Sequence, residues 1–243
     1  GIVRVYANRG SDRCGEWKGF GPAIDTQVPG LSLNQFEVRD MDADGNADLV
    51  GINNGRSQLV WGLGSGSFEQ TAIVDESTDP LSLATGDFDD DGFVDIAVGN
   101  ASAPGGEIIV FEGRGGRNFE RVEGITNPFA TTLFPDAIPI ASMNLDGAST
   151  ERLIFGMSFV NHGYSRSPGV AVLRSEPSAD SYALEDLYGT SPNPEEFLTG
   201  DFDNDGLIDL LTKSAWSRGE VYLGKGHDPS NSRLEFDAEM AFP

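Results

Sequence analysis

The chain has 243 residues, and 39 Asp and Glu against 16 Lys and Arg give it a formal net charge of −23 at pH 7. A surface this acidic repels phosphate backbones and anionic lipids, so we expect no nucleic-acid partner. No apolar run approaches the ~18 residues of a membrane-spanning helix, so membrane insertion is not expected, and the N-terminus does not read as a signal peptide. Cys14 is the only cysteine, so stability must come from packing or from metal rather than from an internal disulfide.

The first 30 residues predict a hairpin of two strands. The run Ile2-Val3-Arg4-Val5-Tyr6 precedes a turn at Asn8-Arg9-Gly10, and a second strand is expected to start between Glu16 and Phe20. In the units that follow, this pattern corresponds to the last two of four strands. Further strands, from the same chain or from another, are therefore expected to complete this half unit.

After the hairpin, one acidic segment recurs along the chain. It reads VRDMDADGNADLVG from Val38, ATGDFDDDGFVDIAVG from Ala84 and LTGDFDNDGLIDLLT from Leu198, with a degraded copy, IASMNLDGASTERLIFG, from Ile140. Each copy is followed by a second apolar run and, in most units, a Gly-rich turn. Short runs of Val, Ile, Leu and Phe are bounded by Gly, Asn and Asp, and no helical apolar stripe is sustained. Each unit therefore predicts four β-strands.

Repeated units of four strands in about 40–60 residues predict an all-β fold, a β-propeller of four-stranded blades. We expect four full blades and one partial blade. The expected boundaries are 1–30 for the half blade, 31–78 for blade one, 79–130 for blade two, 131–190 for blade three and 191–243 for blade four.

The acidic loop between the first two strands of a blade has the composition of a metal site. In blades one, two and four, carboxylates stand at positions 1, 3, 5 and 9 of the loop, and Gly at position 6 permits the positive φ of a tight turn. These carboxylates are Asp40, Asp42, Asp44 and Asp48; Asp87, Asp89, Asp91 and Asp95; and Asp201, Asp203, Asp205 and Asp209. Position 7, held by Asn46, Phe93 or Leu207, would offer a backbone carbonyl. Ca²⁺ accepts six to eight oxygen ligands, so the sequence predicts about three Ca²⁺ sites.

An EF-hand begins with the same residues but needs a Glu at position 12 and flanking helices. Position 12 is Gly51, Val98 or Thr212, and the flanking segments are predicted strands, so the EF-hand interpretation fails. In blade three, Ser142, Asn144 and Asp146 precede a Gly, and one extra residue separates that Gly from Glu151. With two carboxylates lost, we expect a weak or empty site there.

The D-x-D-x-D-G-x-x-D loop between two strands, followed by a V-x-x-G-x-G-x-F element, resembles the FG-GAP/VCBS repeat family. That family includes the integrin α-subunit propeller and many secreted bacterial and fungal propellers, some of them lectins. The resemblance covers nearly the whole chain and implies a calcium-stapled propeller in an extracellular setting. Members typically have seven blades, which implies that further blades complete this ring. The same blades serve adhesins, lectins and polysaccharide-degrading enzymes, so the resemblance fixes no ligand.

A ligand surface is expected on the face opposite the acidic loops, where the second and third strands of each blade are connected. The longest connection is the expected loop Ser158–Gly169 of blade three, and its neighbour in blade four runs from Lys213 to Gly219. Aromatic and cationic side chains gather there in an otherwise acidic chain. We name Tyr164, Arg166, Trp216 and Arg218 as candidate contacts to a glycan or an extracellular protein. The alternative is that these side chains only cover and solvate the end of the barrel.

Catalysis has little support in the sequence, which carries neither a G-x-S-x-G nor an H-E-x-x-H motif. A non-catalytic recognition or adhesion module is therefore favoured. The alternative is the propeller domain of a secreted polysaccharide-degrading enzyme of the lyase type, in which His162, Tyr164 and Arg166 would abstract a proton beside a uronic carboxylate.

Overall fold

The computed structural model of the chain describes thirteen stretches, separated by short gaps. They are residues 1–53, 56–69, 72–75, 80–100, 107–122, 125–126, 140–143, 151–161, 165–176, 181–189, 194–214, 219–228 and 233–241. Every regular element in these stretches is a β-strand, and all strand pairs are antiparallel. None of these residues forms a helix long and apolar enough to cross a membrane. The predicted all-β class is confirmed.

The strands form a hairpin and four sheets that follow one another along the chain. The hairpin pairs β1 (Ile2–Asn8) with β2 (Phe20–Gln27). The first sheet has the order β3 (Gln35–Arg39), β4 (Asp48–Asn53), β5 (Arg56–Val60) and β6 (Ala72–Asp75). The second has β7 (Pro80–Gly86), β8 (Asp95–Asn100), β9 (Glu107–Gly113) and β10 (Phe119–Arg121), with β11 (Ile125–Thr126) also paired to β9.

The third and fourth sheets repeat the same simple order. The third sheet has β12 (Ile140–Met143), β13 (Arg152–Asn161), β14 (Ser165–Glu176) and β15 (Ser181–Gly189). The fourth has β16 (Pro194–Gly200), β17 (Asp209–Ser214), β18 (Gly219–Asp228) and β19 (Arg233–Ala241). Apart from β11, consecutive strands are neighbours in each sheet, and every sheet is built from one continuous segment of sequence.

Each inner sheet buries both of its faces, because side chains alternate along a strand and a neighbouring unit packs on either side. In the first sheet, Val50 and Leu59 pack with apolar residues of the second sheet, whereas Leu49 and Val60 pack with the hairpin. Two further clusters join the second sheet to the third and the third to the fourth. This explains the uninterrupted apolar runs of the sequence: every residue of β8 is buried.

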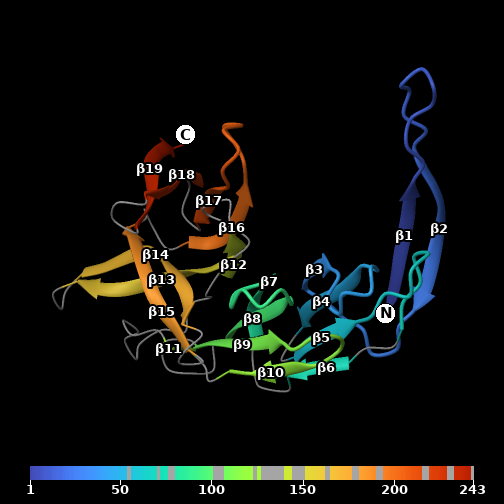
Figure 1. The fold of residues 1–243 in the computed structure, drawn as a ribbon, viewed down its shortest axis with the longest axis horizontal. Helices are drawn as coiled ribbons and strands as arrows, with labels where there is room; N and C mark the ends of the chain where they lie inside the picture. Colours follow the sequence, from blue (N-terminus) through green and yellow to red (C-terminus); the bar gives the residue numbers. More distant parts are fainter. Residues whose placement is uncertain are drawn as a thin grey trace.

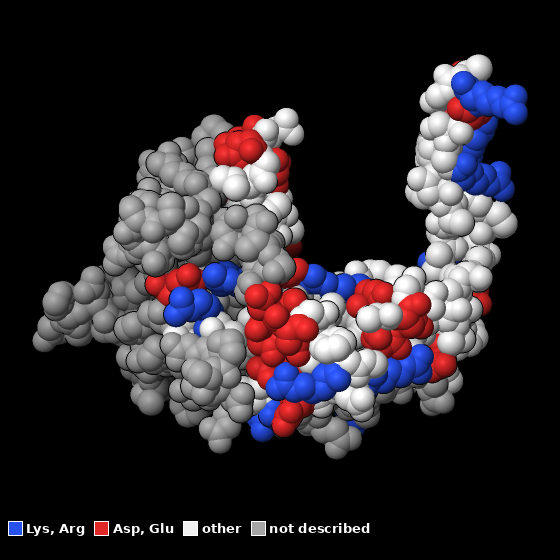
Figure 2. Space-filling view, viewed as in Figure 1, with Lys and Arg blue, Asp and Glu red and all other residues white. Residues whose placement is uncertain are grey.

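The four sheets and the hairpin follow one another along an open arc, with the hairpin at one end and β16–β19 at the other (Figure 1). The first strands of successive sheets lie next to one another, since β3 contacts β7, β7 contacts β12, and β12 contacts β16. The described strands do not close into a ring. The acidic loops that join the first two strands of a sheet contribute red surface over the region of β3 to β10 (Figure 2).

One sequence expectation differs from the structure in the third sheet. The expected loop Ser158–Gly169 is largely a strand extension, because β13 and β14 pair as far as Asn161 with Ser165. Paired backbone groups satisfy their own hydrogen bonds, so this connection is an extended hairpin rather than an irregular loop. In the first sheet, Phe68 forms an isolated bridge with Gly62, and the last strand, β6, begins at Ala72.

Candidate metal centres

The three acidic loops share one backbone conformation. Position 4 has a positive φ in each loop, at Ala43 (60°), Asp90 (64°) and Asn204 (66°). The glycine at position 6 also has a positive φ, close to 90° in all three loops; these glycines are Gly45 (87°), Gly92 (88°) and Gly206 (90°). Two left-handed residues separated by one residue coil the loop tightly, so that side chains at alternate positions point inward.

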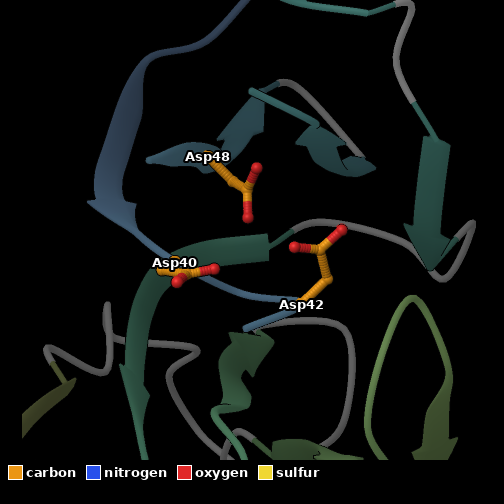
Figure 3. A group of neighbouring side chains, drawn as sticks. All are labelled: Asp40, Asp42 and Asp48. Carbon is orange, nitrogen blue, oxygen red and sulfur yellow. The ribbon is translucent and has the colours of Figure 1, made fainter. Parts of the chain in front are cut away.

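Each loop brings together the carboxylates of positions 1, 3 and 9. Within each group, one oxygen of each side chain lies within 4.8 Å of the others. The groups are Asp40, Asp42 and Asp48; Asp87, Asp89 and Asp95; and Asp201, Asp203 and Asp209. The three side chains of the first loop point toward one another across a common centre (Figure 3).

Position 5 plays a different part in the described loops. The carboxylate oxygen of Asp44 accepts a hydrogen bond from the backbone N–H of Asn46 at 2.7 Å, and Asp91 and Asp205 do the same for Phe93 (2.9 Å) and Leu207 (2.8 Å). This bond lowers the pKa of Asp44. Position 5 therefore fixes the turn and is not a member of the three-carboxylate groups. The ligand role expected for position 5 and for the carbonyl of position 7 stays a prediction.

Position 9 ties the acidic loop to the rest of its sheet. Asp48 is fully buried, and its two oxygens accept the N–H groups of Met41 and Gly62, each at 2.7 Å. Asp95 accepts the N–H groups of Phe88 and Gly113 in the same way, at 2.7 and 2.8 Å. A carboxylate with two backbone donors is held in one orientation, so the first strand, the loop and the end of the third strand share one anchor.

This anchor requires a glycine at or just after the end of the third strand, in the repeated Gly-rich element. A Cβ atom on Gly62 would lie 2.1 Å from the backbone oxygen of Ala47, and one on Gly113 would lie 2.5 Å from that of Val94. No side chain fits between backbones this close. The sequence repeat showed these glycines, but their reason appears only when the loop and the third strand are seen together.

Burial and mutual repulsion act on the grouped carboxylates. Burial raises the pKa of Asp95 to about 8, and the neighbouring charges of Asp89 and Asp91 add to the rise. The pKa values of Asp48, Asp87 and Asp89 are also raised, in each case first by burial. These groups are more stable in the neutral form than ordinary carboxyl groups unless a cation offsets their charge.

The donor set fits a hard divalent cation. Asp87 Oδ1 is buried and has no hydrogen-bond partner, the one such side-chain atom among the described residues. Three carboxylate oxygens within 4.8 Å of one another can surround an ion whose oxygen ligands lie ~2.3–2.6 Å away, which is the range of Ca²⁺. A cation bound at this position would account for the orphaned oxygen of Asp87.

Two arginines that the sequence analysis did not single out border these loops. Arg114, in the turn after β9, lies 3.3 Å from Asp89 and 3.5 Å from Asp91 and also pairs with Glu112. Arg117, in the same turn, reaches the first sheet, where it pairs with Asp42 at 2.9 Å and lies 4.7 Å above the ring of Trp61. The only sequence signal for these contacts was the R-G-G-R turn, which places both arginines beside acidic loops.

The third sheet shows that the sequence alignment of its loop was wrong. In the other sheets the residue before position 1 pairs with position 9, as Arg39 pairs with Asp48 and Gly86 with Asp95. In the third sheet Met143 pairs with Arg152. This pairing makes Asn144, rather than Ser142, position 1 of the loop. Counted from Asn144, Gly147 stands at position 4 and not at position 6.

With this register, position 9 of the third loop is a positively charged residue, Arg152. The Nε of Arg152 donates to Glu185 of β15 at 2.8 Å, and both side chains are nearly buried. A guanidinium at position 9 cannot serve as a metal ligand. The expected weak or empty site thus has a physical basis, although residues 144–150 lie outside the described stretches.

Glu151, the residue before Arg152, connects three sheets through its side-chain contacts. Its carboxylate pairs with Arg39 of the first sheet and accepts the Ser142 hydroxyl at 2.7 Å. Arg39 also donates to the carbonyl of Thr85 in the second sheet at 2.7 Å. A Cβ on Gly86 would lie 2.4 Å from Glu151 Oε2 and 2.7 Å from a ring carbon of Phe88, so a side chain there would displace the Glu151 carboxylate.

The described part of the structure does not bring the four expected ligand-contacting residues together. Tyr164, Trp216 and Arg218 lie outside the described stretches. Arg166 is in β14, where its backbone is paired with Val160. Their expected role therefore stays a prediction.

A comparison with protein families finds an FG-GAP-like repeat over residues 40–98. The matched segment begins at position 1 of the first acidic loop and runs through the second loop into β8. No curated protein matches the chain. The resemblance inferred from the sequence is confirmed over those residues.

Proposed function

We propose that the FG-GAP-like repeat at residues 40–98 extends through the later sheets, and that the chain is a calcium-binding module of the β-propeller type that acts outside cells in recognition, without catalysis. The observation that carries the proposal is the orphaned Oδ1 of Asp87, at position 1 of a loop whose conformation recurs in two other sheets.

The propeller assignment is supported by the order and packing of the sheets. Each of the four sheets contains four strands paired in sequence order, with β11 added to the second sheet; the first strands of successive sheets are neighbours, and each inner sheet packs on both faces. Radial repetition of such sheets is the arrangement of a propeller. On this proposal, β1 and β2 are the two outer strands of a further blade.

Positions 1, 3 and 9 of loops one, two and four are the residues proposed to hold Ca²⁺, with position 5 completing the turn. The cation supplies positive charge and oxygen coordination. The chain supplies rigidity: position 9 is held by two backbone donors, and the left-handed residues fix the loop before the ion arrives. Because such sites lock local backbone, we propose a structural role for the metal rather than a catalytic one.

Calorimetric titration of the chelator-treated chain with CaCl₂ tests this proposal. We expect about three sites, selective over MgCl₂, because Mg²⁺ demands a tighter octahedral shell and keeps its waters. Asp87→Asn should remove one site and leave two. Its control is Asp90→Asn, which alters an exposed carboxylate at position 4 of the same loop. A chain that binds no Ca²⁺, or that keeps all its sites in Asp87→Asn, would contradict the proposal.

Recognition is proposed for the face opposite the acidic loops. It rests on the long β13–β14 hairpin, which extends the connection between the second and third strands of its sheet, and on the cationic and aromatic residues of this part of the sequence. A glycan-array screen with the wild-type chain and with Tyr164→Ala/Arg166→Ala tests it. We expect the double variant to lose binding and keep its calcium-dependent stability, whereas Asp89→Ala should do the reverse. If the double variant binds every glycan as the wild type does, the surface lies elsewhere.

A further inference from the structure

The two arginines of the R-G-G-R turn bind the same position of two different acidic loops. Arg117 Nε donates to Asp42 Oδ2 at 2.9 Å, and Arg114 Nη1 donates to Asp89 Oδ2 at 3.3 Å. Asp42 and Asp89 stand at position 3 of the first and second loops, and their side chains are 7% and 12% exposed. In these two loops a guanidinium therefore occupies one oxygen of a carboxylate that belongs to the candidate metal centre.

The other oxygen of each position-3 carboxylate is also bonded. Asp42 Oδ1 accepts the N–H of Asp44 at 3.2 Å, and Asp89 Oδ1 accepts the N–H of Asp91 at the same distance. These donors are backbone groups, which the left-handed residues of the loop hold in place. The guanidinium is carried by a long side chain with many rotamers, so it is the donor that can leave when a cation takes the carboxylate.

Each arginine has another acidic partner outside the three-carboxylate groups. Arg117 Nη1 donates to Glu69 at 2.7 Å. Arg114 donates to Glu112 and, through its Nε, to Glu120 at 3.2 Å. An arginine that gives up the position-3 carboxylate therefore keeps an anion beside it, and the exchange leaves no guanidinium uncompensated.

The loop of the fourth sheet has the same carboxylates without an arginine. Asp203, at position 3, accepts the N–H of Asp205 at 3.1 Å, as its counterparts do. Within the described stretches, no basic side chain pairs with Asp203. Because the three loops share one backbone conformation, the arginine is a separate feature that two of them have and the third does without.

We propose that Arg117 and Arg114 are exchangeable counter-ions of loops one and two: each holds the position-3 carboxylate of the metal-free loop and releases it to a divalent cation. A cation that must displace a guanidinium binds more weakly than it would to the same loop without one. Arg117 belongs to the second sheet and Asp42 to the loop of the first, so filling of loop one also breaks a contact between two sheets. This inference rests on the proposed calcium sites and names a determinant of their affinity.

Loop one is tested alone in Asp87→Asn/Asp201→Asn, which removes a position-1 carboxylate from each of the other two loops. Calorimetric titration of this parent with CaCl₂ measures the remaining site. Adding Arg117→Gln should tighten Ca²⁺ binding about tenfold, because the competing charge is gone. The matched control is Arg121→Gln, which removes the same charge from an exposed arginine of the same sheet that has no ion pair within the described stretches. It should leave the affinity within about twofold of the parent, since exposed charges are screened by salt.

Loop two is tested in the same way in Asp40→Asn/Asp201→Asn. Arg114→Gln should tighten Ca²⁺ binding there, but it leaves Glu112, which is 4% exposed, without its cation. Arg114→Gln/Glu112→Gln removes both charges and avoids that cost. It should show the same gain in affinity over Glu112→Gln alone.

NMR of the whole chain with isotope-labelled arginine observes the release itself. The Nε–H signal of Arg117, identified by its loss in Arg117→Gln, should shift and exchange faster with water when CaCl₂ saturates the chain, because its bond to Asp42 is lost. The Nε–H signal of Arg4 is an internal control: it donates to Asp25 on the hairpin at 2.7 Å and should stay unchanged.

The inference is overturned if Arg117→Gln binds Ca²⁺ no more tightly than its parent. Weaker binding would show that the arginine positions Asp42 for the ion instead of competing with it. An Arg117 Nε–H signal that saturating CaCl₂ leaves unchanged overturns it as well. Both outcomes leave the proposed calcium sites in place, whereas a wild-type chain that binds no Ca²⁺ contradicts the proposed function and this inference together.

Discussion

Position 4 of the acidic loops requires a left-handed backbone, and the three loops meet this requirement with different residues. Asp90 and Asn204 tolerate the conformation through their short polar side chains, whereas Ala43 has no such compensation at a φ of 60°. The left-handed conformation of Ala43 therefore lowers the stability of the folded state by more than the same conformation does at Asp90 or Asn204.

Ala43→Gly is expected to raise the free energy of unfolding by about 0.5–1 kcal/mol, because glycine removes the steric cost of the left-handed region. Ala47→Gly is the matched control: Ala47 is exposed in the same loop but has no positive φ, so glycine there should destabilise. Urea denaturation of both variants in CaCl₂ measures the difference. Equal losses of stability would show that position 4 carries no strain.

Asp95 makes the stability of the metal-free chain depend on pH. Its pKa in the folded chain is about 8, against 3.8 when unperturbed. Between these values the folded chain binds more protons than the unfolded chain, so the free energy of unfolding falls as pH rises. We expect the melting temperature of the chelated chain to fall between about pH 5 and pH 8.

Saturating CaCl₂ should abolish this fall, because the cation stabilises the ionised form of Asp95. Asp95→Asn should flatten the slope in chelator, whatever its own effect on stability. A melting temperature that rises with pH in the chelated wild-type chain would contradict the assignment.

At the scale of elements, the third sheet has a largely buried ion pair at the place where the other sheets have the position-9 carboxylate. Arg152 and Glu185 join the second strand to the fourth, with exposed side-chain fractions of 12% and 9%. Removing one partner leaves the other charge almost buried, which is costly.

Arg152→Met is expected to lower the free energy of unfolding by about 3 kcal/mol, with the same loss in chelator as in CaCl₂. Arg152→Met/Glu185→Met should recover much of that loss, because no uncompensated charge remains. Denaturation of the single and double variants in both conditions measures this. A double variant no better than the single one would show that the pair itself supplies little stability.

Much of this architecture was predictable from the sequence, because acidic loops and apolar runs alternate at repeat spacing. Residue 40 opens the first loop and Asp48 begins β4, as the pattern indicated. The third loop was misaligned because Gly147 was taken as position 6, and only strand pairing shows that Met143 faces Arg152. Long-range side-chain contacts are not encoded in local pattern, so the part played by Arg117 beside Asp42 could not be foreseen.

At the scale of the whole molecule, charge and metal are linked. Three Ca²⁺ would change the formal charge from −23 to −17, since each ion adds two positive charges. The acidic loops concentrate that charge, and cations that bind only the folded loop would neutralise it.

Excess chelator should therefore lower the melting temperature, and calcium at a hundredfold excess over Kd stabilises by about 2.7 kcal/mol for each site. The loss should be larger at low ionic strength, because salt screens the repulsion between exposed carboxylates. Differential scanning calorimetry at low and high NaCl tests this. A melting temperature that is unchanged by chelator at both salt concentrations would contradict it.

The bridge from Arg39 to Glu151 has a consequence for synthesis on the ribosome. Each sheet comes from one continuous segment and can form soon after its last strand emerges, whereas this ion pair joins residues 112 positions apart. The Arg39 guanidinium, which can bind the Thr85 carbonyl earlier, therefore pairs with Glu151 only after translation delivers the start of β13. The bridge thus closes late and marks the moment when three successive sheets have assembled in order.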